Sequence, residues 1–120
     1  IKNGAIVNIS SIEAIRPAIN HSHYASTKAG LLNLTMSSAL ELGKKNIRVN
    51  SICPGLTERP GLERDWSEGV KSWLDQVPLG RLCTGDDIAN STLFLVSEAS
   101  SFITGACITV DGGISSVSGW

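Results

Sequence analysis

Tyr24 and Lys28 stand four residues apart, near the start of a long segment without proline. In a helix this spacing places both side chains on one face, one turn apart. A tyrosine hydroxyl can donate or accept a proton, and a nearby ammonium group favours its ionised form. The pair is therefore a candidate for acid–base chemistry, and the alternative is an unremarkable pair of surface residues.

Ser11 is a third candidate, because it directly follows an apolar segment that has the character of a buried strand. The segment runs from Ala5 to Ile9, and Asn8 is its only polar residue. Parallel strands covered by helices have such continuous apolar runs. A hydroxyl at the strand end can meet the first turn of the following helix, and active sites collect at this carboxyl edge.

Further along, the sequence alternates between helical and strand patterns. We expect a helix over residues 23–42, with a core-facing stripe of Ala25, Ala29, Leu32, Met36 and Ala39, and an end at Gly43. Residues 47–53 alternate between apolar and polar side chains, which predicts a second strand. Pro54 and Gly55 end this strand. A strand, a helix and a strand in this order predict one βαβ crossover of a parallel sheet.

The second half of the chain contains a long irregular segment and a second crossover. Residues 56–84 form an excursion with one or two short helices around 63–76, typical of a lid or a binding loop. Thr84 or Asp86 can cap the next helix, and residues 108–110 form a third short strand. The side chains expected to face the core from that helix are Ile88, Ala89, Thr92, Leu93 and Val96.

Composition excludes several classes of function. The 120 residues are 42% hydrophobic and 18% charged, with a net charge of -1, which is typical of one globular domain. A chain without a basic cluster attracts nucleic acid poorly, and no uncharged stretch approaches the roughly 20 residues that span a bilayer. We therefore expect neither nucleic acid nor membrane as a partner.

The cysteines and the first residues suggest the context of the chain. Cys53, Cys83 and Cys107 are odd in number and widely spaced, which fits neither a disulfide framework nor a zinc cluster and favours a reducing cytoplasm. The sequence starts at Ile1 and has no signal-peptide profile, so we expect that further sequence precedes it.

Five motifs in order resemble the second half of the short-chain dehydrogenase/reductase family, and the resemblance covers nearly the whole chain. YxxxK alone is a weak signal, whereas the ordered set at this spacing is specific. The motifs are Ile6-Val7-Asn8-Ile9-Ser10-Ser11, Tyr24-Ala25-Ser26-Thr27-Lys28, Ile47-Arg48-Val49-Asn50 with Pro54-Gly55, Thr104-Gly105, and Val110-Asp111-Gly112-Gly113.

The resemblance implies roles for these residues. Tyr24 would be the general acid for carbonyl reduction or the base for alcohol oxidation, and Ser11 would hydrogen-bond the substrate oxygen. Lys28 would bind the nicotinamide ribose and favour the ionised form of Tyr24. Pro54, Gly55 and Thr57 match the family's stretch beside the nicotinamide. The resemblance also implies an NAD or NADP cofactor, without distinguishing the two.

Some family features have no counterpart in the 120 residues. The glycine-rich phosphate loop, the residue that selects the cofactor and a catalytic asparagine belong to the family's other half. Arg59 stands near the position where the family often has a threonine by the cofactor phosphates. Arg59 would either pair with pyrophosphate or point into water.

Three further features have two interpretations each. His21 and His23 are metal ligands or, since no third ligand has matching spacing, loop residues. Cys53 is a reactive thiol near the cofactor or inert packing. The tryptophans, Trp66 and Trp73, lie two helical turns apart and either line a substrate pocket or anchor the excursion.

Together these observations predict an α/β fold, a Rossmann-type doubly wound parallel sheet, of which residues 1–120 are the C-terminal half. The resemblance implies a cytoplasmic NAD(P)-dependent oxidoreductase of a carbonyl compound or alcohol, similar to 3-oxoacyl-carrier-protein reductases and to sugar or polyol dehydrogenases. Helix 23–42 is apolar around most of its surface, so we expect it to be buried on two sides, and the resemblance implies a homodimer or homotetramer through it. The rival interpretations are a non-catalytic binding protein of the same fold and an inactive fragment.

Overall fold

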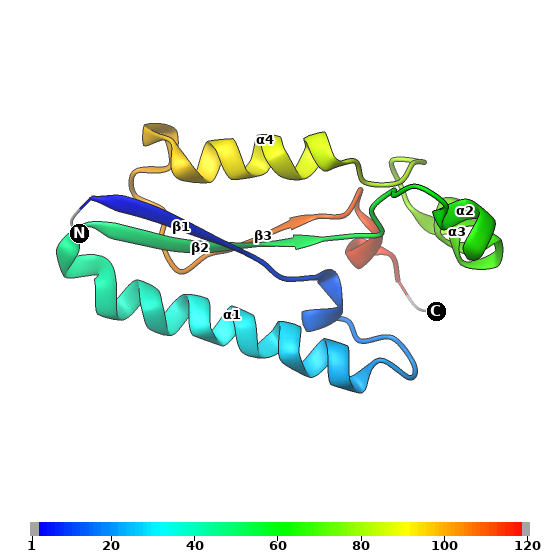
Figure 1. Cartoon of the computed structure of the whole chain (residues 1–120), viewed down its shortest axis with the longest axis horizontal. Coiled ribbons are helices and arrows are strands. Elements are labelled where there is room, and N and C mark those ends of the chain that lie inside the picture. Colours follow the sequence, from blue (N-terminus) through cyan, green and yellow to red (C-terminus); the bar gives the residue numbers. More distant parts are fainter. Residues whose placement is uncertain (1–2, 119–120) are drawn as a thin grey trace.

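The computed structural model describes residues 3–118, which form a three-stranded parallel sheet with helices on both faces. The strands are β1 (Gly4–Ile9), β2 (Ile47–Pro54) and β3 (Cys107–Val110), in the order β1-β2-β3. The register pairs Gly4 with Ile47 and Ser51 with Cys107. Figure 1 shows helix α1 (Ser22–Leu42) below the sheet and α4 (Gly85–Val96) above it. The predicted doubly wound α/β fold is confirmed.

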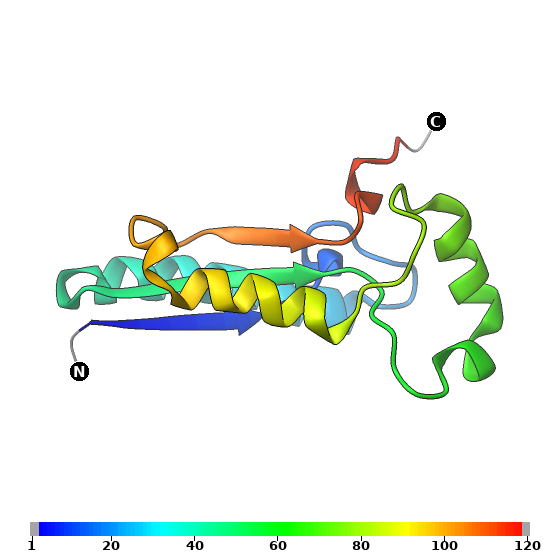
Figure 2. The ribbon, with the colours of Figure 1, turned by 90° about the horizontal axis from the view of Figure 1, so that it is seen from above.

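The long segment between β2 and α4 folds into two short helices, as the sequence indicated. They are α2 (Leu62–Asp65) and α3 (Ser67–Gln76). Figures 1 and 2 both place them beyond the end of the sheet at which the strand arrows point. They therefore stand beside the carboxyl edge of the sheet, where the candidate catalytic residues also lie.

Side chains of β2 form the centre of the core. Val49, Ile52 and Cys53 are almost fully buried, because the strand is paired on both sides and covered on both faces. A hydrogen bond between polar side chains joins the sheet to α1: Asn8 of β1 donates from Nδ2 to the Thr35 hydroxyl of α1 at 3.0 Å. A parallel sheet of this kind holds its loops on a rigid base.

Two core faces predicted from helical spacing are partly wrong. On α1 the buried residues are Ala25, Thr35 and Ala39, whereas Ala29 and Met36 are exposed. Thr35 can be buried because its hydroxyl bonds to both Asn8 and the Leu31 carbonyl. A polar contact thus helps to set which side of α1 faces the sheet, and the spacing of apolar residues does not predict this contact.

On α4, Leu95 is the buried residue, and Ile88 and Thr92 are partly buried. The predicted core residues Ala89, Leu93 and Val96 are exposed. The helix begins after Thr84, which is its N-cap.

At the end of α1, the chain continues from Gly43 into a 3-10 turn (Gly43–Lys45). It then reverses at Asn46, which has a positive φ of 55°.

No helix within residues 3–118 combines the length and the apolar character required to cross a membrane.

Candidate active site

A cleft of about 720 Å³ opens at the carboxyl ends of β1 and β2. Its walls come from the loop after β1, the start of α1, the end of β2, and α3 with the residue before it. All six site residues predicted from the sequence line it: Ser11, Tyr24, Lys28, Pro54, Gly55 and Thr57. The fold thus brings into one cavity residues that lie up to 46 positions apart in the sequence (57 − 11).

Ser11 is fixed by the turn that follows β1. It is 7% exposed and caps the 3-10 turn η1 (Ile12–Ala14), where its Oγ accepts a hydrogen bond from the Glu13 amide at 3.1 Å. A hydroxyl that accepts one bond still has its own hydrogen to donate. Ser11 is therefore positioned rigidly and can donate a hydrogen bond into the cleft.

Tyr24 and Lys28 lie in the first two turns of α1, as their spacing predicts. The Lys28 ammonium nitrogen is 5.6 Å from the centre of the Tyr24 ring and donates to the Ile9 carbonyl at 3.2 Å. This bond ties the lysine to the end of β1, while the tyrosine side chain remains 39% exposed. The pair thus combines an anchored cation with an accessible phenol.

The end of β2 forms the opposite wall. The Gly55 amide donates to the Val110 carbonyl at 2.9 Å, and the Thr57 hydroxyl donates to the Gly55 carbonyl at 3.0 Å. A Cβ atom on Gly55 would lie 2.8 Å from the ring of Trp73, so glycine is required for this close approach. Arg59 is exposed and does not line the cleft.

Comparison with known proteins places this arrangement in a family. Residues 1–115 match the family model described as enoyl-(acyl carrier protein) reductase. The chain is 45% identical over 114 residues to the 3-oxoacyl-[acyl-carrier-protein] reductase FabG of Chlamydia muridarum, covering 94% of this chain and 46% of the relative. The chain belongs to the short-chain dehydrogenase/reductase family.

Solved structures of this family share the fold. A short-chain type dehydrogenase/reductase from Mycobacterium ulcerans superposes with a TM-score of 0.86 at 36% identity, over 93% of this chain and 42% of the other. A protein assigned as a 2-deoxy-D-gluconate 3-dehydrogenase from Agrobacterium tumefaciens was solved with bound NADP. It superposes with a TM-score of 0.89 at 35% identity, over 96% of this chain and 48% of the other. The chain spans about half the length of the relatives it matches.

Two tryptophans, whose role the sequence left open, line the cleft of this short-chain dehydrogenase/reductase chain. Trp66 lies against Gly69, where a Cβ atom would overlap the indole ring. The indole N–H of Trp73 is buried and has no hydrogen-bond partner among the described residues. Buried polar groups rarely stay unpaired, so this N–H is an exception in the wall of the cleft.

A hydrogen bond between Glu13 and His21 was not anticipated from the sequence. The His21 Nδ1 lies 2.9 Å from a Glu13 carboxylate oxygen, and the imidazole meets the Tyr24 ring edge-to-face with centroids 6.3 Å apart. Since an ionised carboxylate only accepts hydrogen bonds, Nδ1 must carry the hydrogen. The pair joins the turn that holds Ser11 to the start of α1. The only sequence signal for it is the presence of both residues in the 12-residue segment between Ser11 and Tyr24.

The imidazole of His21 thus bonds to a carboxylate. Within residues 3–118 no three histidine, cysteine or acidic side chains gather as a metal site would require.

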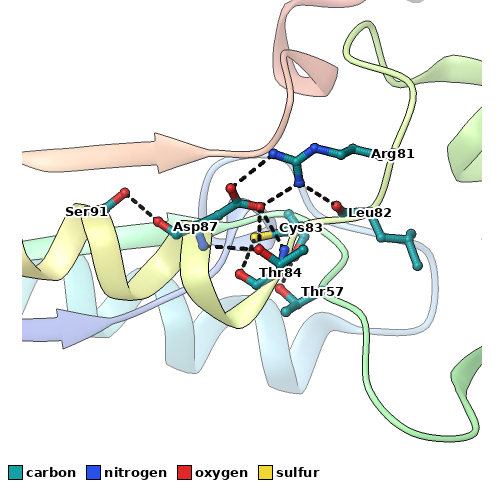
Figure 3. A network of polar contacts seen from close by, with 8 residues as sticks. Thr57, Arg81, Leu82, Cys83, Thr84, Asp87 and Ser91 are labelled. Atoms are coloured by element: carbon teal, nitrogen blue, oxygen red, sulfur yellow. Dashed lines mark hydrogen bonds and ion pairs between the residues drawn. The ribbon is translucent and has the colours of Figure 1, made fainter.

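A second cleft, of about 480 Å³, lies beside the first turn of α4. There the Arg81 guanidinium binds both carboxylate oxygens of Asp87, at 2.7 and 3.0 Å (Figure 3). The amide and hydroxyl of Thr84 donate to the same carboxylate, at 2.8 and 3.0 Å. Arg81, followed by these Thr84 bonds, holds the pKa of Asp87 well below its usual range.

Proposed function

We propose that this chain is the catalytic, C-terminal half of an NAD(P)-dependent oxidoreductase that interconverts a carbonyl compound and a secondary alcohol. We further propose a 3-oxoacyl-carrier-protein reductase-like activity, which the 45% identity to such an enzyme supports. The observation that carries the proposal is the convergence of Ser11, Tyr24 and Lys28 on one cleft at the carboxyl edge of the sheet.

The donor groups of the cleft fit the nicotinamide end of such a cofactor. Lys28 offers an anchored ammonium and Tyr24 a hydroxyl, both suited to ribose oxygens, while Pro54, Gly55 and Thr57 border the position expected for the carboxamide. The cavity volume is within the about 300–1,000 Å³ of typical ligand sites. When bound, the cofactor supplies or accepts the hydride.

The residues of this chain would handle the oxygen of the substrate. In reduction, negative charge develops on the carbonyl oxygen, and Ser11 donates a hydrogen bond to it while Tyr24 donates its phenolic proton. The resulting phenolate is stabilised by the Lys28 ammonium, 5.6 Å from the ring centre. In oxidation the same groups act in reverse, with the Tyr24 phenolate accepting the proton of the alcohol.

We also propose that α1 forms a homodimer or homotetramer contact. Its outward side carries apolar residues that the described chain leaves open, among them Leu34 at 55% and Leu40 at 84% exposure. Leu34→Glu should dissociate the assembly in sedimentation, because burying an unpaired carboxylate costs several kcal/mol. An unchanged sedimentation coefficient in Leu34→Glu would refute the contact.

The setting we propose is the cytoplasm, with a small-molecule carbonyl or alcohol as substrate and neither nucleic acid nor membrane as partner. The three free cysteines and the net charge of -1 support this setting. We expect no activity from the 120 residues alone, because their sequence contains no glycine-rich phosphate loop.

The decisive experiment follows the oxidation of NADH and of NADPH by the full-length protein, with 3-oxoacyl thioesters and simple ketones as substrates. Tyr24→Phe removes one oxygen atom and should lower kcat by about a hundredfold or more while cofactor binding persists. Turnover within tenfold of the wild type would refute the role of Tyr24.

A further inference from the structure

The thiols of Cys53 and Cys107 meet between the two neighbouring strands β2 and β3. Their sulfur atoms are 2.7 Å apart, although the residues are 54 positions apart in the sequence. The strand register pairs Cys107 with Ser51, two residues before Cys53. Residues two apart on a strand point to the same face, so both thiols lie on one face of the sheet. Their contact therefore follows from the strand register.

The two thiols differ in their access to solvent. Cys53 is 0% exposed, whereas Cys107 on the neighbouring strand is exposed. The third cysteine, Cys83, is buried before α4, and its sulfur bonds to the Thr84 carbonyl. An oxidant in solution can thus reach one member of the pair directly, and the other member lies immediately behind it.

The surroundings of Cys53 give the two thiols different parts in an oxidation. Burial, followed by its contacts with Cys107, raises the pKa of the Cys53 thiol to about 12. A protonated thiol is a poor nucleophile toward an oxidant in solution. Cys107 would therefore react first, and Cys53 second with the activated partner beside it.

We propose that Cys53 and Cys107 form a redox site that a hydroperoxide converts into an intrachain disulfide. The Cys107 sulfur attacks one oxygen of the hydroperoxide, the O–O bond breaks, and a sulfenic acid forms as an alcohol, or water from hydrogen peroxide, leaves. The Cys53 sulfur then attacks the Cys107 sulfur; the S–O bond breaks, and the hydroxyl leaves as water with the Cys53 proton. Two thiols are oxidised and one hydroperoxide is reduced.

The position of the site determines what the disulfide does. It joins the carboxyl end of β2, next to Pro54 and Gly55, to the edge strand β3. Such a cross-link restricts the unfolded chain and stabilises the folded one. Because small thiols reduce accessible disulfides, the link is reversible in a reducing compartment. The protein thus carries an oxidation-dependent clamp on the sheet that supports its cleft.

The test is peptide mapping of the full-length protein, before and after treatment with hydrogen peroxide. Unreacted thiols are alkylated, and digestion with trypsin and a glutamate-specific protease separates the three cysteines into residues 49–58, residues 82–98 and the peptide that begins at residue 99. We expect peptide 49–58 and the peptide that begins at residue 99 to become linked in most molecules. Dithiothreitol should then release them.

Two variants make the test specific. Cys107→Ser changes an exposed residue, so the protein should fold, and the link should be absent. Cys83→Ser is the matched control and should leave the link intact. Oxidation should also raise the melting temperature of the wild type and of Cys83→Ser by several degrees, but not that of Cys107→Ser.

Three results would overturn the proposal. The first is full alkylation of both Cys53 and Cys107 after peroxide treatment. The second is a link that includes Cys83, or one that joins two copies of the chain. The third is over-oxidation of Cys107 with Cys53 still free, which would show that the buried thiol does not react with its partner.

Discussion

Two polar regions of this chain, the cleft at Ser11 and the first turn of α4, differ in how their groups are satisfied. At α4 the Asp87 carboxylate receives bonds from the Arg81 guanidinium and from both donors of Thr84 (Figure 3). Thr84 and Asp87 form a capping box, because the Asp87 amide in turn donates to the Thr84 hydroxyl. In the cleft, Tyr24 is partly exposed and the Trp73 N–H is unpaired among the described residues. The polar groups at α4 thus have their hydrogen-bond partners within the chain, whereas some of those in the cleft do not.

This difference separates a structural network from a binding site. Saturated hydrogen bonds hold a loop and a helix end in place, and little remains with which to bind another molecule. Unsaturated, anchored groups in a cavity have no internal partner and are ready for one from outside. Substitutions in the cleft should therefore change activity at constant stability, and substitutions at α4 should change stability.

Among the substitutions that compare the two regions, Lys28→Ala should have the largest effect, and that effect is on activity. Loss of the ammonium should lower kcat by about a hundredfold and also weaken cofactor binding, because the residue is proposed to serve both. Steady-state kinetics and a cofactor titration of the full-length protein measure the two effects separately.

Lys71→Ala is the matched control. The exposed side chain of Lys71 pairs with the exposed Asp75 of α3 at 2.9 Å, so its loss should leave kcat and cofactor affinity unchanged. Unaltered cofactor affinity in Lys28→Ala would remove the proposed ribose contact.

Asp87→Asn should lower the melting temperature by a few degrees, since it weakens both the pair with Arg81 and the cap of α4. The pKa of Asp87 is depressed in the folded state, so its contribution is present above the unfolded pKa, about 4, and is lost as the pH falls below that value. Melting curves should thus differ between wild type and variant at pH 7 and converge toward pH 2.

Asp86→Asn provides the comparison for Asp87. It removes the same charge from the same helix turn, but Asp86 is exposed and outside the network with Arg81. Its effect on the melting temperature should be smaller. Equal losses in the two variants would mean that the helix dipole, not the network, stabilises this end of α4.

The smallest expected effect concerns the link between Glu13 and His21. Glu13→Ala should lower kcat by roughly twofold to tenfold, because one partly exposed hydrogen bond then no longer holds the loop of Ser11 against α1. Glu13→Gln should restore turnover, since its amide oxygen still accepts the His21 N–H. Failure of this rescue would show that the charge of Glu13 matters rather than its position.

Much of the fold followed from the sequence because its signals are local. The first strand has a dense apolar run and the second an alternating pattern. Pro54 with Gly55 marks the end of the second strand, which the structure extends by one residue to Pro54. The cleft could also be anticipated, since parallel strands bring their carboxyl ends to one edge. The helical repeat alone was enough to predict that Tyr24 and Lys28 lie on one face of a helix.

The contacts that the sequence did not reveal join distant segments through single atoms. Arg48 of β2 donates to the carbonyl groups of Leu95 and Ser97 at the end of α4, from 47 and 49 positions away. The meeting of Cys53 with Cys107 depends on the exact register of two strands. The periodic spacing of apolar residues carries no information on such pairs. They can be recognised only when the relative positions of the strands and helices are known.

The arrangement of the sheet also sets the order in which the chain can fold. The central strand β2 pairs with β1, already synthesised, but its other neighbour β3 begins only at Cys107. At about 5–20 residues per second, a ribosome needs roughly 3–11 seconds to pass from the end of β2 to the end of β3. During that interval one edge of the strand that becomes most buried is unpaired. The nascent chain is then most exposed to aggregation, and a chaperone has most to protect.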